Sequence, residues 1–347
     1  MRHYQFNLHN LSICMKKPTV YDIARHAGVS VSTVSRFNNQ TGYITREKVQ
    51  AIEQAISALG FNAKTTKHHG NKARSMKIGV IVPTFDNSYF ASILNGMSHC
   101  AQGSAYSLRI ESSRFSKIRE QKIIKQMLDL DVDALVLVVS LLNEDEIKRL
   151  VGHLPILIVA GSDKGSLPIL KIDNVIAGKI ATNHLIQLGH TKIVHAYGRL
   201  NEGPDAKDRL EGYKQSLLEA GLQIDPRLIV DGGYYTEPSC NAVIQLIKDD
   251  IPFSAVFAAN DLSAYGVIQA LKEHNINVPQ QISVIGFDDL YTSAIFTPAL
   301  TTIRQPLYDI GTIALDHICD IMSNNADTPF IPPVELIIRG STSKAVN

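Results

Sequence analysis

The spacing of apolar residues divides the chain into a short helical segment and a long segment in which strands and helices alternate. Near the N-terminus, apolar residues recur with the i, i+3, i+4, i+7 spacing of an amphipathic helix, at Val20, Ile23, Ala24 and Ala27. Thr19 stands where it can cap that helix. The pattern therefore predicts a helix that buries one narrow face.

Two further helices are predicted directly after the first. Gly28 ends the first helix, Ser30 can cap a second one, and Val34 supplies the inward contact of the second. Two short helices joined by a tight glycine-containing turn form a helix-turn-helix. A third helix is expected from the cap Thr45 to Leu59, closed by Gly60.

The outer face of the second helix has the composition of a surface that enters a DNA groove. It carries Val31, Ser32, Thr33, Ser35 and Arg36. Four of these side chains are short enough to let a helix enter the major groove, and Arg36 can reach a guanine edge or a phosphate. Charge supports this interpretation, because residues 16–77 contain eleven lysines and arginines against three acids, whereas the remainder after residue 77 has a net charge of −8.

From residue 77 onward, apolar runs alternate with amphipathic helical patterns. The runs read IGVIV, ALVLVV, PILIVA, KIVHAY, AVFAA and ISVIGF. Strands that are apolar throughout indicate parallel sheets covered on both faces. We expect two doubly wound α/β lobes, residues 77–172 and 173–301, with the late run TTIRQ returning to the first lobe and VELIIRG to the second. A two-lobed architecture of this kind resembles that of a periplasmic binding protein.

Polar and aromatic residues follow several of these strands, where ligands of parallel sheets bind. Asn87, Tyr89 and Phe90 are expected in a loop, and Arg209, Asn260, Asp288 and Gln305 follow later strands. Amides, a carboxylate and a guanidinium beside aromatic faces suit a polyhydroxylated ligand. For Asp261, Asp289 and Asn174 a cap or turn role is as good an explanation as a binding role.

Other functional classes lack support in the sequence. The chain has no phosphate-binding loop, no nucleophile elbow, no dinucleotide fingerprint and no metal-ligand spacing, so we expect neither enzymatic activity nor a cofactor or metal. The four cysteines are far apart and no export signal is seen, which favours a cytoplasmic protein without membrane contact. The alternative is a periplasmic-type sugar receptor without a DNA role.

The first segment also matches a known family. The stretch TVYDIARHAGVSVSTVSR, followed by GYITREKVQAIEQAISALGF, resembles the DNA-binding domain of the lactose-repressor and galactose-repressor family of bacterial transcription regulators. The resemblance implies that bases are read by Val31, Ser32 and Arg36. It places at or near phosphates Tyr21, Thr33, Ser35, Asn39, Tyr43 and Thr45.

The resemblance extends over nearly the whole chain, because the long segment looks like the family's effector domain. It carries onto effector-contacting positions Arg209, Asn260, Asp288 and Gln305. Sugar-responsive members commonly place an Asp-Arg pair after the fourth strand, where this chain has Ala160 and Gly161. The identity of the effector therefore stays open, as does its action as inducer or corepressor.

The segment between the two domains departs from the family. A proline and a hinge helix whose leucine wedges into the minor groove are usual there, whereas this chain has Ala63, Lys67 and Gly70 at the proline, alanine and leucine positions. A glycine cannot act as an apolar wedge, so we expect bound DNA to be kinked less than by typical members.

These observations predict an organisation in four parts. Residues 1–14 form an extension, with translation starting at Met1 or Met15; residues 15–62 form the helix-turn-helix domain; residues 63–76 form a basic linker; and residues 77–347 form the two-lobed effector-binding and dimerisation domain. No heptad segment ends the chain, so we expect a homodimer that binds a near-palindromic operator. The predicted function is repression of a carbohydrate-utilisation operon under the control of a sugar-like effector.

Overall fold

The structure is a computed structural model, and it divides into two compact units, Met1–Ala73 and Arg74–Asn347. It describes residues 20–30, 33–34, 37, 44–58, 75–161, 165–199, 204–325 and 327–346, without the side chains of 20–22 and 204. The predicted linker falls almost wholly outside these ranges, as do Ala63, Lys67 and Gly70. The four-part division of the chain therefore stays a prediction.

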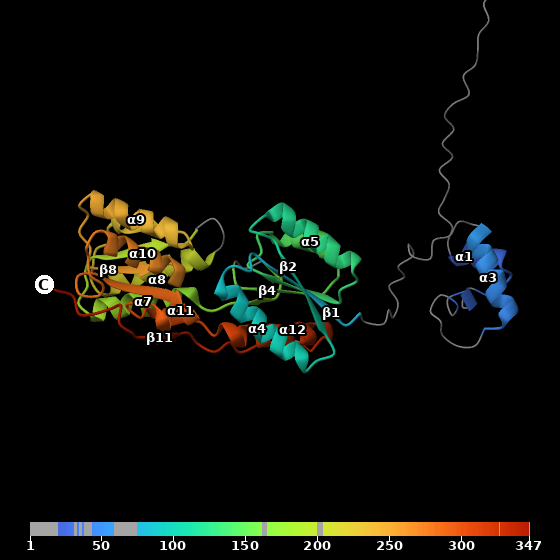
Figure 1. Cartoon of the computed structure of the whole chain (residues 1–347). Coiled ribbons are helices and arrows are strands. Elements are labelled where there is room, and N and C mark those ends of the chain that lie inside the picture. The colour runs from blue at the N-terminus through green and yellow to red at the C-terminus, as the bar shows by residue number, and fades with distance from the viewer. Residues whose placement is uncertain are drawn as a thin grey trace, which may run out of the picture. The chain divides into compact units, whose positions relative to one another are not determined.

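The small unit has the helices that the apolar spacing predicts (Figure 1). They include α1 (Val20–His26) and α3 (Arg46–Ala58), with helical residues between them at 33, 34 and 37. The backbone N–H of Thr33 donates to Ser30 Oγ at 3.2 Å, so Ser30 caps the second helical segment as expected. The core of this unit consists of Ile23, Ala24, Val34, Ile52 and Ala55.

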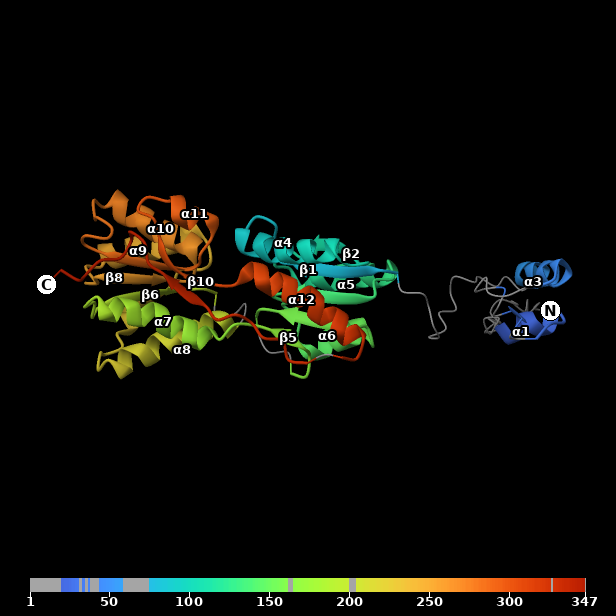
Figure 2. The ribbon, with the colours of Figure 1, turned by 90° about the horizontal axis from the view of Figure 1, so that it is seen from below.

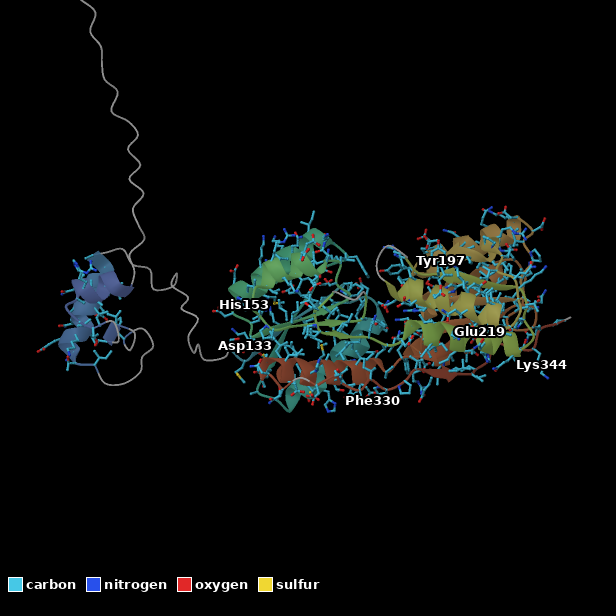
Figure 3. All side chains as sticks on the ribbon, turned by 180° about the vertical axis from the view of Figure 1, so that it is seen from behind. Asp133, His153, Tyr197, Glu219, Phe330 and Lys344 are labelled. Atoms are coloured by element: carbon cyan, nitrogen blue, oxygen red, sulfur yellow. The ribbon has the colours of Figure 1, made fainter. Side chains whose placement is uncertain are left out.

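The large unit consists of two lobes, marked in Figure 3 by Asp133 and His153 on lobe 1 and by Tyr197 and Glu219 on lobe 2. Lobe 1 contains a parallel sheet of strand order β2-β1-β3-β4-β5. Its strands are β1 (Lys77–Val82), β2 (Ser107–Ser112), β3 (Ala134–Val138), β4 (Ile156–Val159) and β5 (Ile169–Leu170). Its helices are α4 (Ser88–Gln102), α5 (Lys117–Asp129), α6 (Glu144–Val151) and α12 (Leu307–Met322).

Lobe 2 contains a sheet of order β11-β10-β9-β8-β6-β7, in which β11 alone among these strands runs antiparallel to its neighbour. Its strands are β6 (Ile193–Tyr197), β7 (Ile229–Asp231), β8 (Ala255–Ala258), β9 (Ser283–Asp288), β10 (Thr301–Arg304) and β11 (Glu335–Ile337). Its helices are α7 (Asn174–Gln187), α8 (Pro204–Glu219), α9 (Thr236–Lys248), α10 (Asp261–Glu273) and α11 (Tyr291–Ile295), with a short 3-10 helix at Pro226–Leu228.

The strands β1, β3, β4, β6, β8 and β9 consist mainly of apolar residues because helices cover both faces of each sheet. In lobe 1, side chains of β3 alternate between a core shared with α4 and α12 and a core shared with α5 and α6. Helices α4 and α12 lie side by side (Figure 2) and approach closely at Gly96, where a Cβ atom would come within 2.0 Å of the Tyr308 carbonyl oxygen. No described helix has the length and apolar character needed to span a lipid bilayer.

One predicted assignment is wrong. The run TTIRQ does not return to lobe 1, because it forms β10 and pairs in parallel with β9 of lobe 2. The chain returns to lobe 1 only afterwards, as α12, whose apolar side chains complete the lobe 1 core. VELIIRG lies in lobe 2 as predicted, with β11 pairing to β10.

Candidate functional site

A cavity lies between the two lobes at the carboxyl ends of the strands. Its volume is about 680 Å³, part of it open to solvent. We call it the cleft, and its lining residues are Asn87, Tyr89, Phe90, Phe115, Val139, Asp205, Arg209, Tyr234, Tyr235, Asn260 and Asp288. The cleft therefore contains six of the seven residues predicted to contact an effector.

The topology explains why these residues meet. In a doubly wound sheet a crevice opens where the strand order reverses, because the connections on either side lead to opposite faces. In lobe 1, β2 and β3 lie on opposite sides of β1, so the strand order reverses at β1. In lobe 2, β7 and β8 lie on opposite sides of β6, so the order reverses there. Asn87 follows β1, Arg209 follows β6 and Asn260 follows β8. Each lobe thus contributes its switch point to one shared cavity.

On the lobe 1 side, the expected loop of Asn87, Tyr89 and Phe90 is in fact the start of α4. Asn87 is the N-cap, and its side-chain oxygen accepts the Tyr89 backbone N–H at 2.9 Å. An asparagine cap allows the helix to begin at once after the short turn, so the two aromatic residues project from its first turn. The Phe90 ring meets Phe115 edge-on at 6.4 Å between centroids, and burial raises the pKa of Tyr89.

On the lobe 2 side, Arg209 is held by three contacts. Its Nε donates to Asn174 Oδ1 at 2.9 Å, one terminal nitrogen donates to the Ala259 carbonyl at 2.6 Å, and the guanidinium carbon lies 3.9 Å from the centre of the Phe287 ring. The side chain is buried. A guanidinium fixed in this way is an oriented donor inside the cavity.

Asp288 ends β9 in an uncommon backbone conformation with φ at 111°. Gln305 Nε2 donates to Asp288 Oδ1 at 2.7 Å, so Gln305 lies behind Asp288 and does not line the cleft. Burial raises the pKa of Asp288 to about 8, with Arg209 opposing the shift. Near neutral pH this carboxyl group can therefore donate as well as accept a hydrogen bond.

Three residues for which the sequence allowed either a binding role or a cap or turn role make contacts within the protein. Asp261 is buried and accepts hydrogen bonds from Ser293 Oγ, from Thr302 Oγ1 and from the Leu290 backbone N–H, at 2.6 to 2.7 Å. Asp289 pairs with Arg304 and Arg339, and so does not face the same partners as Asp288. Asn174 begins α7 and positions Arg209.

Five lining residues were not predicted. Phe115 follows β2, and Tyr234 and Tyr235 follow β7; both are edge strands with partly exposed side chains, so neither appears as an apolar run. Val139 follows β3 directly. Asp205 lies in the first turn of α8, four residues before Arg209, and its position after the run KIVHAY could have indicated it.

Few of the predicted DNA-contacting residues lie in the described ranges. Thr33 is half-buried and its hydroxyl lies 2.8 Å from Ser30 Oγ, whereas Thr45 is exposed at the start of α3. Tyr21 belongs to α1, without a described side chain. The others lie outside the described residues, namely Val31, Ser32, Ser35, Arg36, Asn39 and Tyr43.

Comparison with known proteins identifies both parts of the chain. Residues 19–63 match the model of bacterial regulatory proteins of the lacI family, and residues 182–342 match a periplasmic binding protein-like domain. The transcriptional regulator RegA of Clostridium saccharobutylicum is 30% identical over 330 residues, covering 93% of this chain and 99% of its own. The chain belongs to the lacI family.

Two further similarities support the membership of this protein in the lacI family. The ribose operon repressor of Escherichia coli is 30% identical over 301 residues, which cover 86% of this chain and 91% of that protein. A structure of the lac repressor dimer bound to operator and the anti-inducer ONPF superposes with a TM-score of 0.71 at 25% identity, covering 94% of this chain and 100% of that one.

Family membership establishes the class of function. The protein is a DNA-binding transcriptional regulator with a two-lobed domain of the periplasmic-binding type. The alternative of a sugar receptor without a DNA role is not favoured, because the helix-turn-helix match belongs to the same chain. The relatives are regulators and not enzymes.

Proposed function

We propose that the protein is a homodimeric repressor whose affinity for a near-palindromic operator is controlled by a sugar-like ligand in the cleft. The observation that carries the proposal is the lining of the cleft, which combines aromatic rings with oriented polar groups on a chain that also has a helix-turn-helix. The names of two similar proteins, a ribose operon repressor and a lac repressor, point in the same direction.

The chemistry of the cleft suits a ring with several hydroxyl groups. Each hydroxyl group both donates and accepts, and Asn87, Asn260 and Asp288 offer complementary groups. Aromatic faces such as those of Phe90 and Phe115 cover the C–H surfaces of such a ring. We therefore assign the seven predicted residues to effector binding, six by contact and Gln305 through Asp288.

The proposed mechanism is a shift between two states. A ligand held by both lobes favours one lobe angle, and the two states present the DNA-binding segments of a dimer differently to the operator halves. The ligand can change operator affinity by no more than its own difference in affinity for the two states.

Arg36 provides the test of DNA reading. The operator is first selected from a random duplex pool, and its affinity is then measured for wild type, Arg36→Ala and Arg36→Lys. We expect the alanine variant to bind the selected operator about tenfold to a hundredfold more weakly, because one good bidentate base contact is worth about 1–3 kcal/mol.

Arg36→Lys serves as the matched control. It retains the positive charge, so its binding to unrelated DNA should equal that of wild type while the preference for the operator falls. Equal operator affinity of all three proteins would show that Arg36 does not read the operator.

A thermal-shift screen of sugars and sugar phosphates tests the other half of the proposal. A sugar that raises the melting temperature of wild type but not of Asp288→Ala identifies both the ligand class and the site. A sugar that stabilises both proteins equally would contradict the assignment of the cleft.

A further inference from the structure

Asp205 forms hydrogen bonds to both lobes. It lies in the first turn of α8 in lobe 2, where it lines the cleft. Its Oδ1 accepts from Asn174 Nδ2 at 3.0 Å within lobe 2, and its Oδ2 accepts from the backbone N–H of Gly161 at 3.1 Å. Gly161 follows β4 of lobe 1. One carboxylate therefore connects the two walls of the cavity.

The backbone of lobe 1 is shaped for this contact. Ala160 and Gly161 both have positive φ, 57° and 86°, a region that glycine adopts without steric cost and alanine does not. These two residues stand where sugar-responsive members of the family commonly place an Asp-Arg pair. In this chain lobe 1 offers a backbone donor at that place, and lobe 2 supplies the carboxylate.

Asp205 has acceptor capacity left for a ligand. An ionised carboxylate has two oxygens with about four lone-pair sites and no donor. Gly161 and Asn174 each use one site, and Asp205 faces the cleft. A ligand that meets this group must bring hydrogen-bond donors, as a hydroxyl group does.

The lining of the cleft offers an anionic ligand no cluster of bases. Asp205 is an acceptor there, burial raises the pKa of Asp288 to about 8 so that it is mostly neutral near pH 7, and among the described lining residues Arg209 is the only base. Arg209 already donates to Asn174 and to the Ala259 carbonyl. Other proteins bind phosphate with clusters of arginine and lysine, and the described lining of the cleft has no such cluster.

Helix N-termini, which can also bind phosphate, are capped in the cleft. The side-chain oxygen of Asn87 accepts an N–H of α4, and that of Asn260 accepts the Ser263 N–H of α10 at 2.9 Å. The first turn of α8 carries Asp205 itself. One N–H at each of the α4 and α10 termini is therefore already bonded to a side chain of the protein.

We propose that Asp205 is a specificity-determining residue, which selects an uncharged polyhydroxylated ligand over its phosphorylated form and ties lobe 2 to the Gly161 N–H of lobe 1. The selectivity rests on the proposed function of the cleft, whereas the tie between the lobes does not. The two parts can therefore fail separately.

The tie is tested without a ligand by hydrogen exchange at the Gly161 amide of the full chain. Asp205→Ala removes both acceptor oxygens, so we expect exchange at Gly161 at least tenfold faster than in wild type. In Asp205→Asn the single oxygen can accept from Gly161 or from the Asn174 amide but not from both, so exchange at Gly161 should also be faster than in wild type, by less. Glu211→Gln is the matched control, because Glu211 is exposed on the same helix and bonds only locally to Gln215 among the contacts of the described residues.

A double variant separates the hydrogen bond between the lobes from the negative charge at position 205. Asp205→Asn combined with Asn174→Asp restores a donor and acceptor match between the two side chains and keeps an acceptor for Arg209 Nε. Slow exchange at Gly161 should return in this variant. Exchange at Gly161 that is equal in wild type and Asp205→Ala, which has no side-chain acceptor, would overturn the hydrogen bond between the lobes.

Selectivity is tested with D-ribose, D-glucose and D-galactose and with the terminal phosphate esters of the same sugars. We expect wild type and Glu211→Gln to bind a neutral sugar and to reject its ester at least tenfold. Asp205→Asn and the double variant should bind the neutral sugar about tenfold more weakly and lose this preference, because the charge has left position 205 in both.

The outcomes separate the proposals. A phosphate ester that binds wild type as tightly as its parent sugar overturns the selectivity. Full recovery of sugar binding and preference in the double variant would reduce Asp205 to a purely structural role. Binding of none of these sugars to wild type would count against the sugar-responsive function, while the exchange measurement still decides the tie.

Discussion

The two lobes meet the same cavity with different chemistry. Lobe 1 presents the rings of Tyr89, Phe90 and Phe115 and one amide, Asn87. Lobe 2 presents the rings of Tyr234 and Tyr235, the amide of Asn260 and every acidic or basic lining residue that the structure describes, Asp205, Arg209 and Asp288. Rings thus line both walls, whereas the acidic and basic groups lie on one. We therefore expect lobe 2 to orient a ligand through hydrogen bonds and lobe 1 to cover mainly its apolar faces.

The division has an energetic consequence. Hydrogen bonds to charged groups contribute about 1.5–3 kcal/mol, and an unpaired buried partner costs as much again. Covering an apolar face contributes in proportion to the area removed from water and is less dependent on geometry. Substitutions in lobe 2 should therefore reduce ligand affinity more than substitutions of comparable size in lobe 1.

The largest effect is expected from Arg209→Ala. It removes the donor that faces the cleft and leaves Asn174 Oδ1 and the Ala259 carbonyl without their arginine partner in the interior. We expect a loss of ligand affinity of about a hundredfold or more, together with a lower melting temperature. Calorimetric titration measures the first effect and thermal denaturation the second.

Arg227→Ala is the control for this change, because Arg227 belongs to the same lobe but is exposed and paired with Asp225. It should bind as wild type does. Equal affinity of wild type and Arg209→Ala would remove the basis for assigning orientation to lobe 2.

A smaller effect is expected from Phe115→Ala in lobe 1. The variant loses one ring that lines the cleft and contacts Phe90, so ligand affinity should fall about tenfold. Ile118→Ala, with a side chain 81% exposed on α5 of the same lobe, should leave affinity unchanged. A loss for Phe115→Ala as large as that for Arg209→Ala would contradict the proposed division.

The last effect concerns the pH dependence of stability and not ligand affinity. Burial raises the pKa of Asp288 from 3.8 to about 8, so between these values the folded chain holds a proton that the unfolded chain has lost. The contribution of Asp288 to the free energy of unfolding should therefore decrease as pH rises through this window and level off above it.

Asp288→Asn removes this contribution. The difference in unfolding free energy between wild type and Asp288→Asn should shift against wild type as pH rises from about 4 to about 8. Chemical denaturation at a series of pH values measures this difference. A difference independent of pH across that window would mean that Asp288 is not protonated in the folded protein.

Much of the architecture follows from residue patterns. The central strands β1, β3, β4, β6, β8 and β9 are all apolar runs, because each is covered on both faces. The edge strands β2 and β7 could not be identified in that way, since their side chains are partly exposed. The assignment of β10 to lobe 2 depends on its pairing with β9, and the residue pattern of β10 itself carries no information about that partner.

The lining residues of the cleft differ in the same way. Arg209, Asn260 and Asp288 follow recognisable strands, so their convergence was predictable. The role proposed for Asp205 depends on its hydrogen bond to Gly161, which lies 44 residues earlier and on the other lobe. No motif links two such residues, because the contact exists only when the lobes face each other.

A ligand in the cleft is proposed to control operator binding. The most direct test of this control is the operator affinity of the full chain with and without a saturating sugar that stabilises it, repeated with Asp288→Ala. We expect the sugar to change wild-type operator affinity by at least about fivefold, in either direction, and to leave that of Asp288→Ala unchanged. Operator affinity of wild type that is the same with and without the bound sugar would contradict the account.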